Sequence, residues 1–157
     1  MKVGDIIPDF VLKDQKNEEF NLYDIQDKMV LLSFHPLAWT GVCTKQMQSL
    51  EDYKDELDSL GVLAVGISVD SSPSKKAWAE SIGVHNTKLI SDFWPHGEVS
   101  KSLDLFLPEK GVSKRANVLV AKNKEILFMK IYDMSSIPNL DEITEFIKRE
   151  RSKGREL

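Results

Sequence analysis

The stretch HPLAWTGVCTKQMQSL, residues 35–50, lies where a hydrophobic run gives way to a helical pattern, and it contains the only cysteine of the chain, Cys43. The run before it, KMVLLSFH (28–35), is continuous and β-prone, as expected for a central strand that is covered on both faces. From Cys43 onward, apolar residues recur every three or four positions, which indicates one buried helical face. The stretch therefore predicts a strand-to-helix junction with a lone thiol at the start of the helix.

The rest of the chain alternates short hydrophobic runs with longer helical patterns, which is typical of an α/β fold. We expect one domain over residues 1–157, with a central mixed β-sheet flanked by helices on both faces. The predicted strands are 9–14, 18–25 (or a turn segment), 28–35, 62–70, 87–93 and two strands within 115–133 around a left-handed turn at Asn123; the predicted helices run from Thr40 to Gly61, from Ser72 or Ser74 to Gly83, over 97–106 and over 136–152.

Composition excludes several classes of function. The net charge of −4 argues against nucleic acid as a partner, because phosphate binding needs a clustered basic face. No apolar run approaches the ~20 residues of a membrane-spanning helix, and Pro8 and Asp9 interrupt the N-terminus before a secretory signal could form. We therefore expect a cytoplasmic protein without a membrane partner. The single cysteine fits that compartment and excludes both a Cys-x-x-Cys pair and a multi-cysteine zinc site.

The start of the predicted helix is electrically favourable for a thiolate. Pro36 cannot donate to a sheet ladder and should end the strand, while Thr40 is a good N-cap residue, which places Cys43 in the first helical turn. The N–H groups of that turn have no intrahelical partner and give the helix end a partial positive charge, which stabilises an anion. Since ligands of α/β sheets bind beyond the carboxyl ends of the strands, we also expect the sulfur to lie near the surface.

Arg115 is the leading candidate for a second cation beside Cys43. It opens the β-prone run RANVLV, which should lie next to strand 28–35. The alternative is that Cys43 is only a buried filler, since free cysteines are among the most often buried residues. The junction favours a reactive thiol, but the residues alone leave both interpretations open.

Several stretches resemble the peroxiredoxin family, the alkyl hydroperoxide reductase/thiol-specific antioxidant superfamily. PLAWTGVC, with the pattern Pro36-x-x-x-Thr40-x-x-Cys43, is similar to the active-site signature of that family. VGDIIPDFVLKD (3–14) resembles its N-terminal start, ISDFWPHGEVSKSL (90–103) resembles a later segment, and Arg115 stands where its active-site arginine does. The likeness covers nearly the whole chain. It implies a thioredoxin-like fold and a thiol-dependent peroxidase that reduces hydrogen peroxide or organic hydroperoxides.

The resemblance also implies a role for each residue of the signature. The Cys43 thiolate would attack a peroxide oxygen and become a sulfenic acid. The Thr40 hydroxyl would orient the peroxide, Arg115 would stabilise charge on the breaking O–O bond, and Pro36 would shield the sulfur from water. The expected catalytic residues are Cys43, Thr40 and Arg115. The expected substrate-binding residues are Pro36, Thr40 and Arg115, and no cofactor or metal is implied.

Two departures from the family pattern affect the expected chemistry. Gln46 stands where many relatives have glutamate. Loss of the carboxylate should not hinder formation of the thiolate, but we expect a different local hydrogen-bond network. The absence of a second cysteine implies the one-Cys type, in which an external thiol, such as thioredoxin, glutaredoxin or a low-molecular-weight thiol, reduces the sulfenic acid.

Two rival functions use the same thiol differently. A redox-sensing or holdase-type binding protein would change its association when Cys43 is oxidised, without turnover. A thiol–disulfide reductase would need the second cysteine that this chain lacks, because the usual mechanism resolves a mixed disulfide internally.

The histidines and tryptophans have mostly structural interpretations. The three histidines match no usual metal-ligand spacing: His35, His85 and His96. We expect His35 to make a structural hydrogen bond and Trp78 to lie on the inner face of its helix. Trp39 and Trp94 are not placed by periodicity and could line the active pocket or a contact between subunits, where aromatic residues are enriched. The family resemblance implies a homodimer.

Overall fold

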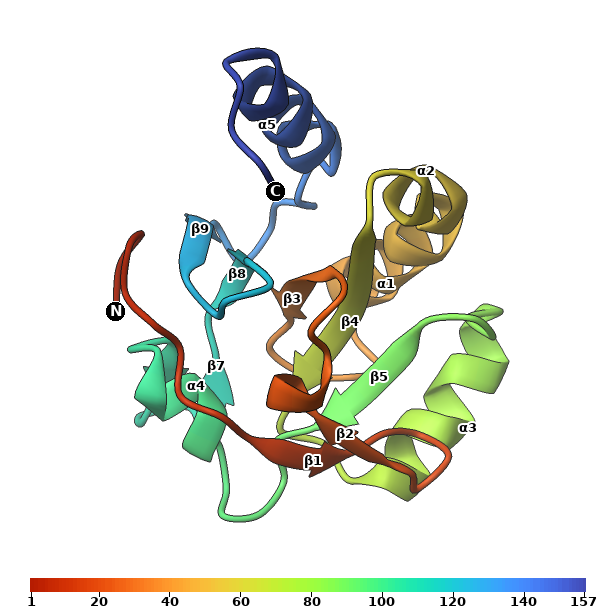
Figure 1. Cartoon of the computed structure of the whole chain (residues 1–157). Helices are drawn as coiled ribbons and strands as arrows, with labels where there is room; N and C mark the ends of the chain where they lie inside the picture. Colours follow the sequence, from red (N-terminus) through yellow and green to blue (C-terminus); the bar gives the residue numbers. More distant parts are fainter.

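The computed structural model describes residues 1–157 and is built on a seven-stranded mixed sheet (Figure 1). The strand order is β2-β1-β5-β4-β3-β8-β9. Strands β3, β4 and β5 are parallel to one another, whereas β8 is antiparallel to β3 and β9 is antiparallel to β8. The bounds are β1 Val11–Lys13, β2 Glu19–Asn21, β3 Met29–Phe34, β4 Val62–Ser68, β5 Lys88–Ser91, β8 Arg115–Val120 and β9 Ile126–Tyr132. The expected central mixed sheet is confirmed.

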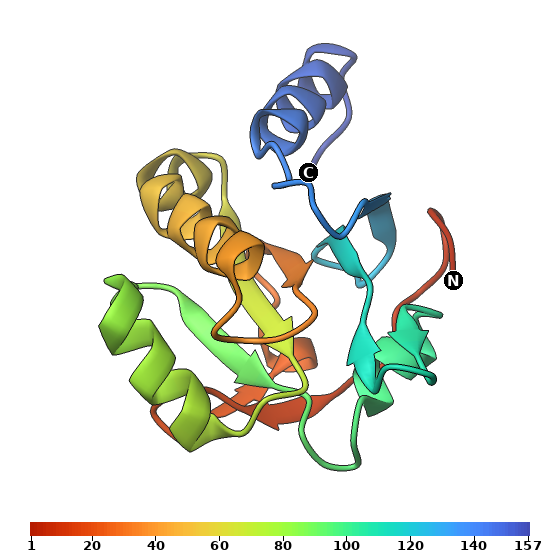
Figure 2. The same cartoon turned by 180° about the vertical axis from the view of Figure 1, so that it is seen from behind.

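Helices cover both faces of the sheet, as the sequence predicts (Figures 1 and 2). One apolar cluster joins the sheet to α1, α2, α3 and α5, and the other joins it to α4 and the N-terminal segment. The bounds are α1 Gly41–Asp52, α2 Lys54–Ser59, α3 Ser72–Ile82, α4 Glu98–Ser102, α5 Asp141–Ser152 and the 3-10 helix η1 Leu22–Asp24. None of these helices combines the length and the apolar character that crossing a membrane requires.

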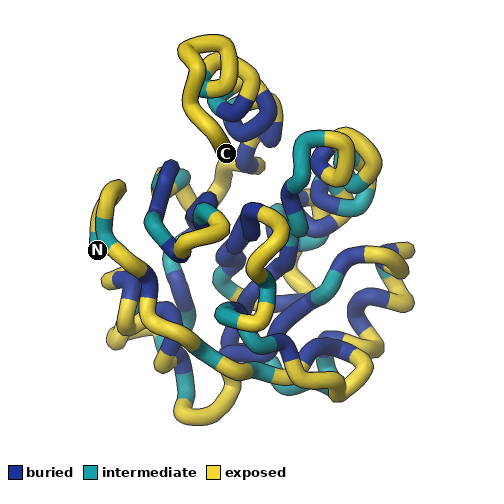
Figure 3. Tube along the Cα trace, in the orientation of Figure 1, coloured by how far each residue is buried: buried dark blue, intermediate teal, exposed yellow.

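Strand β3 lies at the centre of both clusters. All six of its residues are buried, and successive side chains point to opposite faces of a strand. Leu31 therefore packs in the cluster that contains α1, while Val30 and Leu32 pack in the other. Figure 3 shows the same distribution, with buried residues along the inner strands and exposed residues on the outer turns. The continuous hydrophobic run 28–35 follows from this two-sided burial.

The helix predicted from Thr40 to Gly61 is divided at Tyr53 into α1 and α2. Its apolar spacing continues through the break, so the pattern did not reveal it. Helix α3 begins at Ser72, which is one of its two predicted starts, and its N-cap residue is Ser71, whose hydroxyl accepts from the Ser74 N–H at 3.4 Å.

Three further details differ from the sequence prediction. The left-handed residue of the β8–β9 turn is Lys124 (φ 74°), because the Asn123 side chain instead accepts from the Glu125 N–H. Helix α5 begins at Asp141 instead of residue 136. A two-stranded sheet, β6 Phe106–Leu107 with β7 Val112–Ser113, was not predicted, because two-residue strands are too short to show a period.

The topology brings distant segments to one edge of the sheet. The carboxyl ends of β3, β4 and β5 meet there because these strands are parallel. Strand β8 runs the other way and begins at the same edge, where Ala116 pairs with Phe34. Arg115 is therefore placed next to the end of β3, from which the chain continues to α1. This edge is where ligands of α/β sheets bind.

Candidate active site

Cys43 is the third residue of α1 and so lies in its first turn, as predicted. Thr40 is the N-cap residue, in an extended conformation (φ −103°, ψ 156°), and its carbonyl accepts from the Thr44 N–H at 2.9 Å. Its hydroxyl does not cap the helix but donates to the Leu37 carbonyl at 2.7 Å. Cys43 thus lies in the helical turn whose N–H groups have no intrahelical partner.

The expectation that the sulfur lies near the surface is wrong, because Cys43 is only 1% exposed. The first turn of α1 packs against the sheet, and Cys43 shares an apolar cluster with Ala38 and Met47. Gly66 of β4 makes this close packing feasible, since a Cβ atom there would collide with the Met47 side chain. Burial alone is also what a cysteine with only a packing role would show. The polar partners of Cys43 therefore have to distinguish a packing residue from a reactive thiol.

Arg115 is the polar partner of Cys43. Its Nη1 atom lies 3.4 Å from the Cys43 Sγ and 2.7 Å from the Gln46 Oε1, and its Nη2 donates to the Met134 carbonyl at 2.9 Å. Arg115 is 3% exposed, and β8 lies beside β3 as the sequence predicts. The structure therefore brings together two of the four predicted site residues, which are 72 positions apart in the chain.

Gln46 links Arg115 to the sheet. Its Nε2 donates to the Ser33 hydroxyl at 2.8 Å and to the Phe34 carbonyl at 3.1 Å, and Ser33 donates to the Asn117 Oδ1 at 2.7 Å. The whole network is buried. Because the Gln46 amide is neutral, it holds the guanidinium in place without cancelling its charge.

The loop before α1 is fixed by the neighbouring strand ends. The Asp70 carboxylate, just after β4, accepts from the Ala38 N–H at 2.8 Å and from the Ser68 hydroxyl at 2.6 Å. Trp39 has a left-handed backbone (φ 71°), and its indole N–H donates to the Ser74 hydroxyl at 3.0 Å. Thr40 is exposed on this loop and Pro36 is half-buried, and neither forms a hydrogen bond with Cys43.

His35 makes an interior contact with Lys75, and both side chains are fully buried. The Lys75 Nζ lies 3.1 Å from the His35 Nε2. Burial lowers the pKa of Lys75 from 10.5 to about 7, although Asp70, Cys43 and Asp92 act in the opposite direction. Burial and the Lys75 charge hold the pKa of His35 well below its usual value. His35 is thus a hydrogen-bonded core residue.

One of the three tryptophans is buried, and it is Trp78, the one that the helical pattern placed on an inner face. Trp78 is 1% exposed, and its indole N–H donates to the Thr44 hydroxyl at 3.3 Å, which joins α3 to α1. Trp39 and Trp94 are exposed. No three His, Cys, Asp or Glu side chains lie together in an arrangement that could hold a metal ion.

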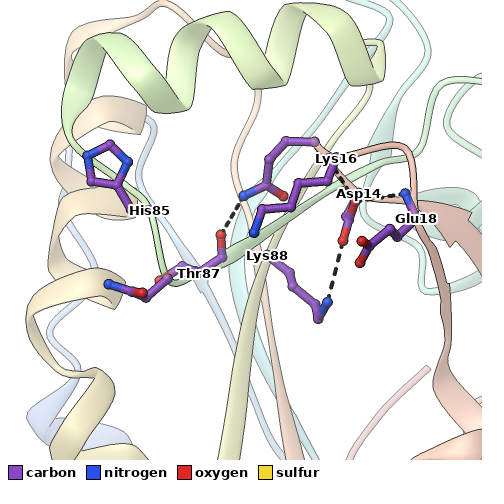
Figure 4. Close-up of a pocket in the computed structure, with 8 residues that line it drawn as sticks. Asp14, Lys16, Glu18, His85, Thr87 and Lys88 are labelled. Carbon is purple, nitrogen blue, oxygen red and sulfur yellow. Dashed lines mark hydrogen bonds and ion pairs between the residues drawn. The ribbon is translucent and has the colours of Figure 1, made fainter.

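A polar hollow between the β1–β2 turn and the start of β5 is separate from this site (Figure 4). Its polar side chains contact neighbouring residues of the protein. Gln15 donates a hydrogen bond to the Thr87 carbonyl and accepts one from the Leu89 N–H, each at 2.8 Å, and the Lys88 Nζ lies 3.4 Å from the Asp14 carboxylate. These contacts tie β1 to β5, so we interpret the hollow as part of the scaffold.

Sequence reasoning did not find Asp70 or Lys75. Asp70 could have been found, because it follows a buried strand that is parallel to 28–35, and such strand ends share an edge. Lys75 stands three positions before Trp78 on α3, and residues with this spacing share a helical face. Its charge is the property that normally marks an exposed residue, so the pattern pointed away from it.

Comparisons with known proteins agree with this geometry. The model of the AhpC/TSA family matches residues 3–129. Alkyl hydroperoxide reductase E of Mycobacterium tuberculosis is 37% identical over 129 residues, which cover 82% of this chain and 84% of the relative. Peroxiredoxin Bcp of Escherichia coli is 44% identical over 92 residues, 59% of this chain and 58% of the relative. The reduced 2-Cys peroxiredoxin of Plasmodium vivax superposes with a TM-score of 0.86 at 28% identity, covering 98% of this chain and 86% of that one.

The solved structure confirms the thioredoxin-like fold, and the class that fold and family define is that of the thiol-dependent peroxidases. The chain belongs to the AhpC/TSA family and is a peroxiredoxin, as the sequence resemblance indicated. In general terms, its activity is the reduction of peroxides at the expense of thiols.

We predict that Lys75→Met stabilises the fold. The pKa of Lys75 is lowered to about 7 from 10.5, so the unfolded chain binds the proton more tightly and the buried lysine is destabilising at neutral pH. The variant should raise the free energy of unfolding by about 1–4 kcal/mol at pH 7, as buried charges replaced by apolar side chains do. The increase in the free energy of unfolding over wild type should be largest below pH 7 and should shrink as pH rises from there toward 10.5. Urea unfolding across this range measures it, with the exposed neighbour Lys76→Met as control; a loss of stability would contradict the interpretation.

Proposed function

We propose that the chain is a one-Cys peroxiredoxin in which Cys43 reduces hydrogen peroxide or an organic hydroperoxide and an external thiol restores it. The observation that supports this most directly is the Arg115 guanidinium, 3.4 Å from the Cys43 Sγ in the first turn of α1. A helix N-terminus and an arginine both stabilise a thiolate, which is the nucleophilic form of cysteine. The whole chain, 1–157, acts as one domain in this proposal.

The proposed reaction has two stages. The Cys43 thiolate attacks one peroxide oxygen, the O–O bond breaks, and the departing oxygen takes up a proton and leaves as water or an alcohol. The sulfur is then a sulfenic acid. One external thiol condenses with it to a mixed disulfide and releases water, and a second thiol displaces Cys43 as the thiolate.

Each remaining signature residue has a task in the first stage. Arg115 faces the sulfur from β8 and stabilises the negative charge that spreads over the breaking O–O bond. Thr40 is exposed one turn before Cys43, and its hydroxyl orients the peroxide for in-line attack. Pro36 closes the same loop and limits the access of water to the thiol. None of these tasks needs a cofactor or a metal.

We predict that Arg115→Ala slows the oxidation of Cys43 by about 10²–10³-fold, the usual effect of removing a group that stabilises charge in the transition state. The second-order rate constant with hydrogen peroxide can be measured by stopped-flow tryptophan fluorescence. Arg149→Ala, at an exposed position of α5, is the matched control and should react like the parent. Circular dichroism checks that the fold of each variant is retained.

Three results would contradict this assignment. An unchanged rate constant in Arg115→Ala removes the arginine from its role. Wild-type Cys43 that reacts no faster than free cysteine at the same pH removes the peroxidase function from this site, as does full activity in Cys43→Ser.

The single cysteine supports the one-Cys cycle, because no second thiol exists in the chain to form a disulfide. The reductant is therefore thioredoxin, glutaredoxin or a low-molecular-weight thiol, and the cytoplasm is the proposed location because these thiols are kept reduced there.

We predict sustained peroxide consumption with at least one reductant in a panel of thioredoxin, glutaredoxin with glutathione, and dithiothreitol. Fresh peroxide should be consumed in amounts well above one equivalent per chain, and Cys43→Ser should consume none. Oxidation that stops after one equivalent with every reductant would favour the alternative function, a redox-sensing or holdase-type binding protein switched by Cys43 oxidation.

The protein is further proposed to form a homodimer through an aromatic rim, defined as Leu37, Trp39, Phe93 and Trp94. These side chains are 41–79% exposed, although large apolar residues are normally buried. Their loops follow β3 and β5, which are parallel, so the rim lies at the edge of the sheet near Cys43. Aromatic residues are enriched where proteins associate.

We predict that Trp94→Glu shifts the chain from dimer to monomer in sedimentation equilibrium, since a charge would have to be desolvated in the contact. Val3→Glu, which changes an exposed apolar residue near the N-terminus, is the control and should leave the mass unchanged. A wild-type protein that is monomeric at all concentrations would refute the homodimer, and a dimer that survives Trp94→Glu would exclude the rim as its interface.

A further inference from the structure

Lys75 is a lysine whose side chain is fully buried in the protein interior, on the inner face of α3. Lysine is almost never found there without a carboxylate partner, because desolvation of an ammonium group costs several kcal/mol. The one hydrogen-bond partner of Lys75 is the neutral ring of His35, at 3.1 Å. The opposite ring atom, Nδ1 of His35, has no partner at all.

No carboxylate pairs with this lysine. None of the ion pairs of the molecule includes Lys75. The two carboxylates whose charge acts on Lys75 form hydrogen bonds to other groups: Asp70 accepts from the Ala38 N–H and the Ser68 hydroxyl, and Asp92 accepts from two N–H groups at the start of α4. Lys75 therefore has no carboxylate in direct contact, and the charges of Asp70, the Cys43 thiolate and Asp92 act on it from a distance.

The surroundings of Lys75 join it to the helix that contains Cys43. Trp78, one turn further along α3, donates to the hydroxyl of Thr44, the residue after Cys43. The His35 ring lies 5.3 Å from the Trp78 ring. The same imidazole and the Met47 side chain approach Gly66 together, so His35 lies against the inner side of α1. Lys75 and Cys43 are thus parts of one buried cluster between α1 and α3.

We propose that Lys75, held by His35, is a positioning residue that supplies a second positive charge to the Cys43 thiolate and so accelerates its reaction with peroxide. The proposal rests on the peroxidatic role of Cys43 proposed above. Arg115 reaches the sulfur from β8, whereas Lys75 acts from α3 through the electric field, which is strong in a dry interior.

The charge of Lys75 depends on pH and on the groups that face it. These come from every neighbouring element: His35 after β3, Cys43 on α1, Asp70 after β4, Asp92 after β5 and Arg115 on β8. Burial lowers the pKa of Lys75 to about 7, and Asp70, the Cys43 thiolate and Asp92 partly offset that effect. Its positive charge is therefore present below about pH 7 and is lost as pH rises.

The test is the pH profile of the rate constant for Cys43 oxidation in the full-length protein, measured with hydrogen peroxide from about pH 5 to about pH 9. Wild type should lose rate as pH rises through the titration of Lys75. Lys75→Met should be slower by about tenfold near pH 6, equal to wild type near pH 9, and without that alkaline decline. The exposed neighbour Lys76→Met is the matched control and should follow the wild-type profile.

A second variant separates an electrostatic role from a structural one. In His35→Phe, Lys75 keeps its burial but loses its hydrogen-bond partner, so the alkaline decline should move to lower pH. A purely structural role of the pair would change the stability of the protein and leave the pH profile where it is in wild type.

The outcomes distinguish this inference from the proposed function. If Lys75→Met and Lys76→Met have the same rates and profiles while Cys43→Ser is inactive, the role of Lys75 is overturned and the peroxidase function stands. A wild-type profile without an alkaline decline also overturns it, even if Lys75→Met does not fold. If wild-type Cys43 reacts no faster than free cysteine, the proposed function fails and the inference fails with it.

Discussion

The contact of the Arg115 guanidinium with α1 is the constraint on which the site depends. Through two hydrogen bonds from one nitrogen it joins the start of β8 to both Cys43 and Gln46, and Gln46 in turn is bonded to β3. The helix that contains the thiol is thereby fixed to the sheet at its first turn, where its own N–H groups are unpaired. The antiparallel register of β8 on β3 is what makes this contact geometrically available.

The network around Arg115 is polar but contains no counter-charge. Ser33, Gln46 and Asn117 are neutral, and all are buried. A carboxylate at position 46 would pair with the guanidinium and offset part of its field at the sulfur, whereas the amide satisfies its hydrogen bonds only. The departure from the family pattern at Gln46 thus keeps positive charge directed toward Cys43. Lys75 resembles Arg115 in this respect, because its hydrogen-bond partner is also a neutral side chain and not a carboxylate.

Much of the fold could be predicted because its determinants are local. The continuous run 28–35 and the periodic face beginning at Cys43 identified the central strand and α1, and α3 ends at Gly83 as predicted. The proximity of Arg115 and Cys43 was also predictable, because it follows from strand adjacency.

What the sequence did not reveal depends on tertiary packing. The burial of Cys43 follows from how closely α1 approaches β4 over Gly66, and no periodicity records that distance. The burial of Lys75 contradicts its residue type, and the Asn117–Ser33 contact joins residues 84 positions apart. Such contacts become visible only when the strands and helices are assembled.

The depth of Cys43 has a consequence for the order of events in a catalytic cycle. In the proposed cycle, a sulfur that is 1% exposed reacts first with a peroxide, which is a small molecule, and then with a thiol, which in a redoxin brings a whole protein surface with it. Disulfide formation requires the two Cα atoms to come within about 7 Å, so a redoxin can attack only if the loop before α1 or the first turn itself moves aside. On this proposal the packing around Cys43 discriminates against large reductants, so the reduction step demands a larger change of protein shape than the oxidation step does.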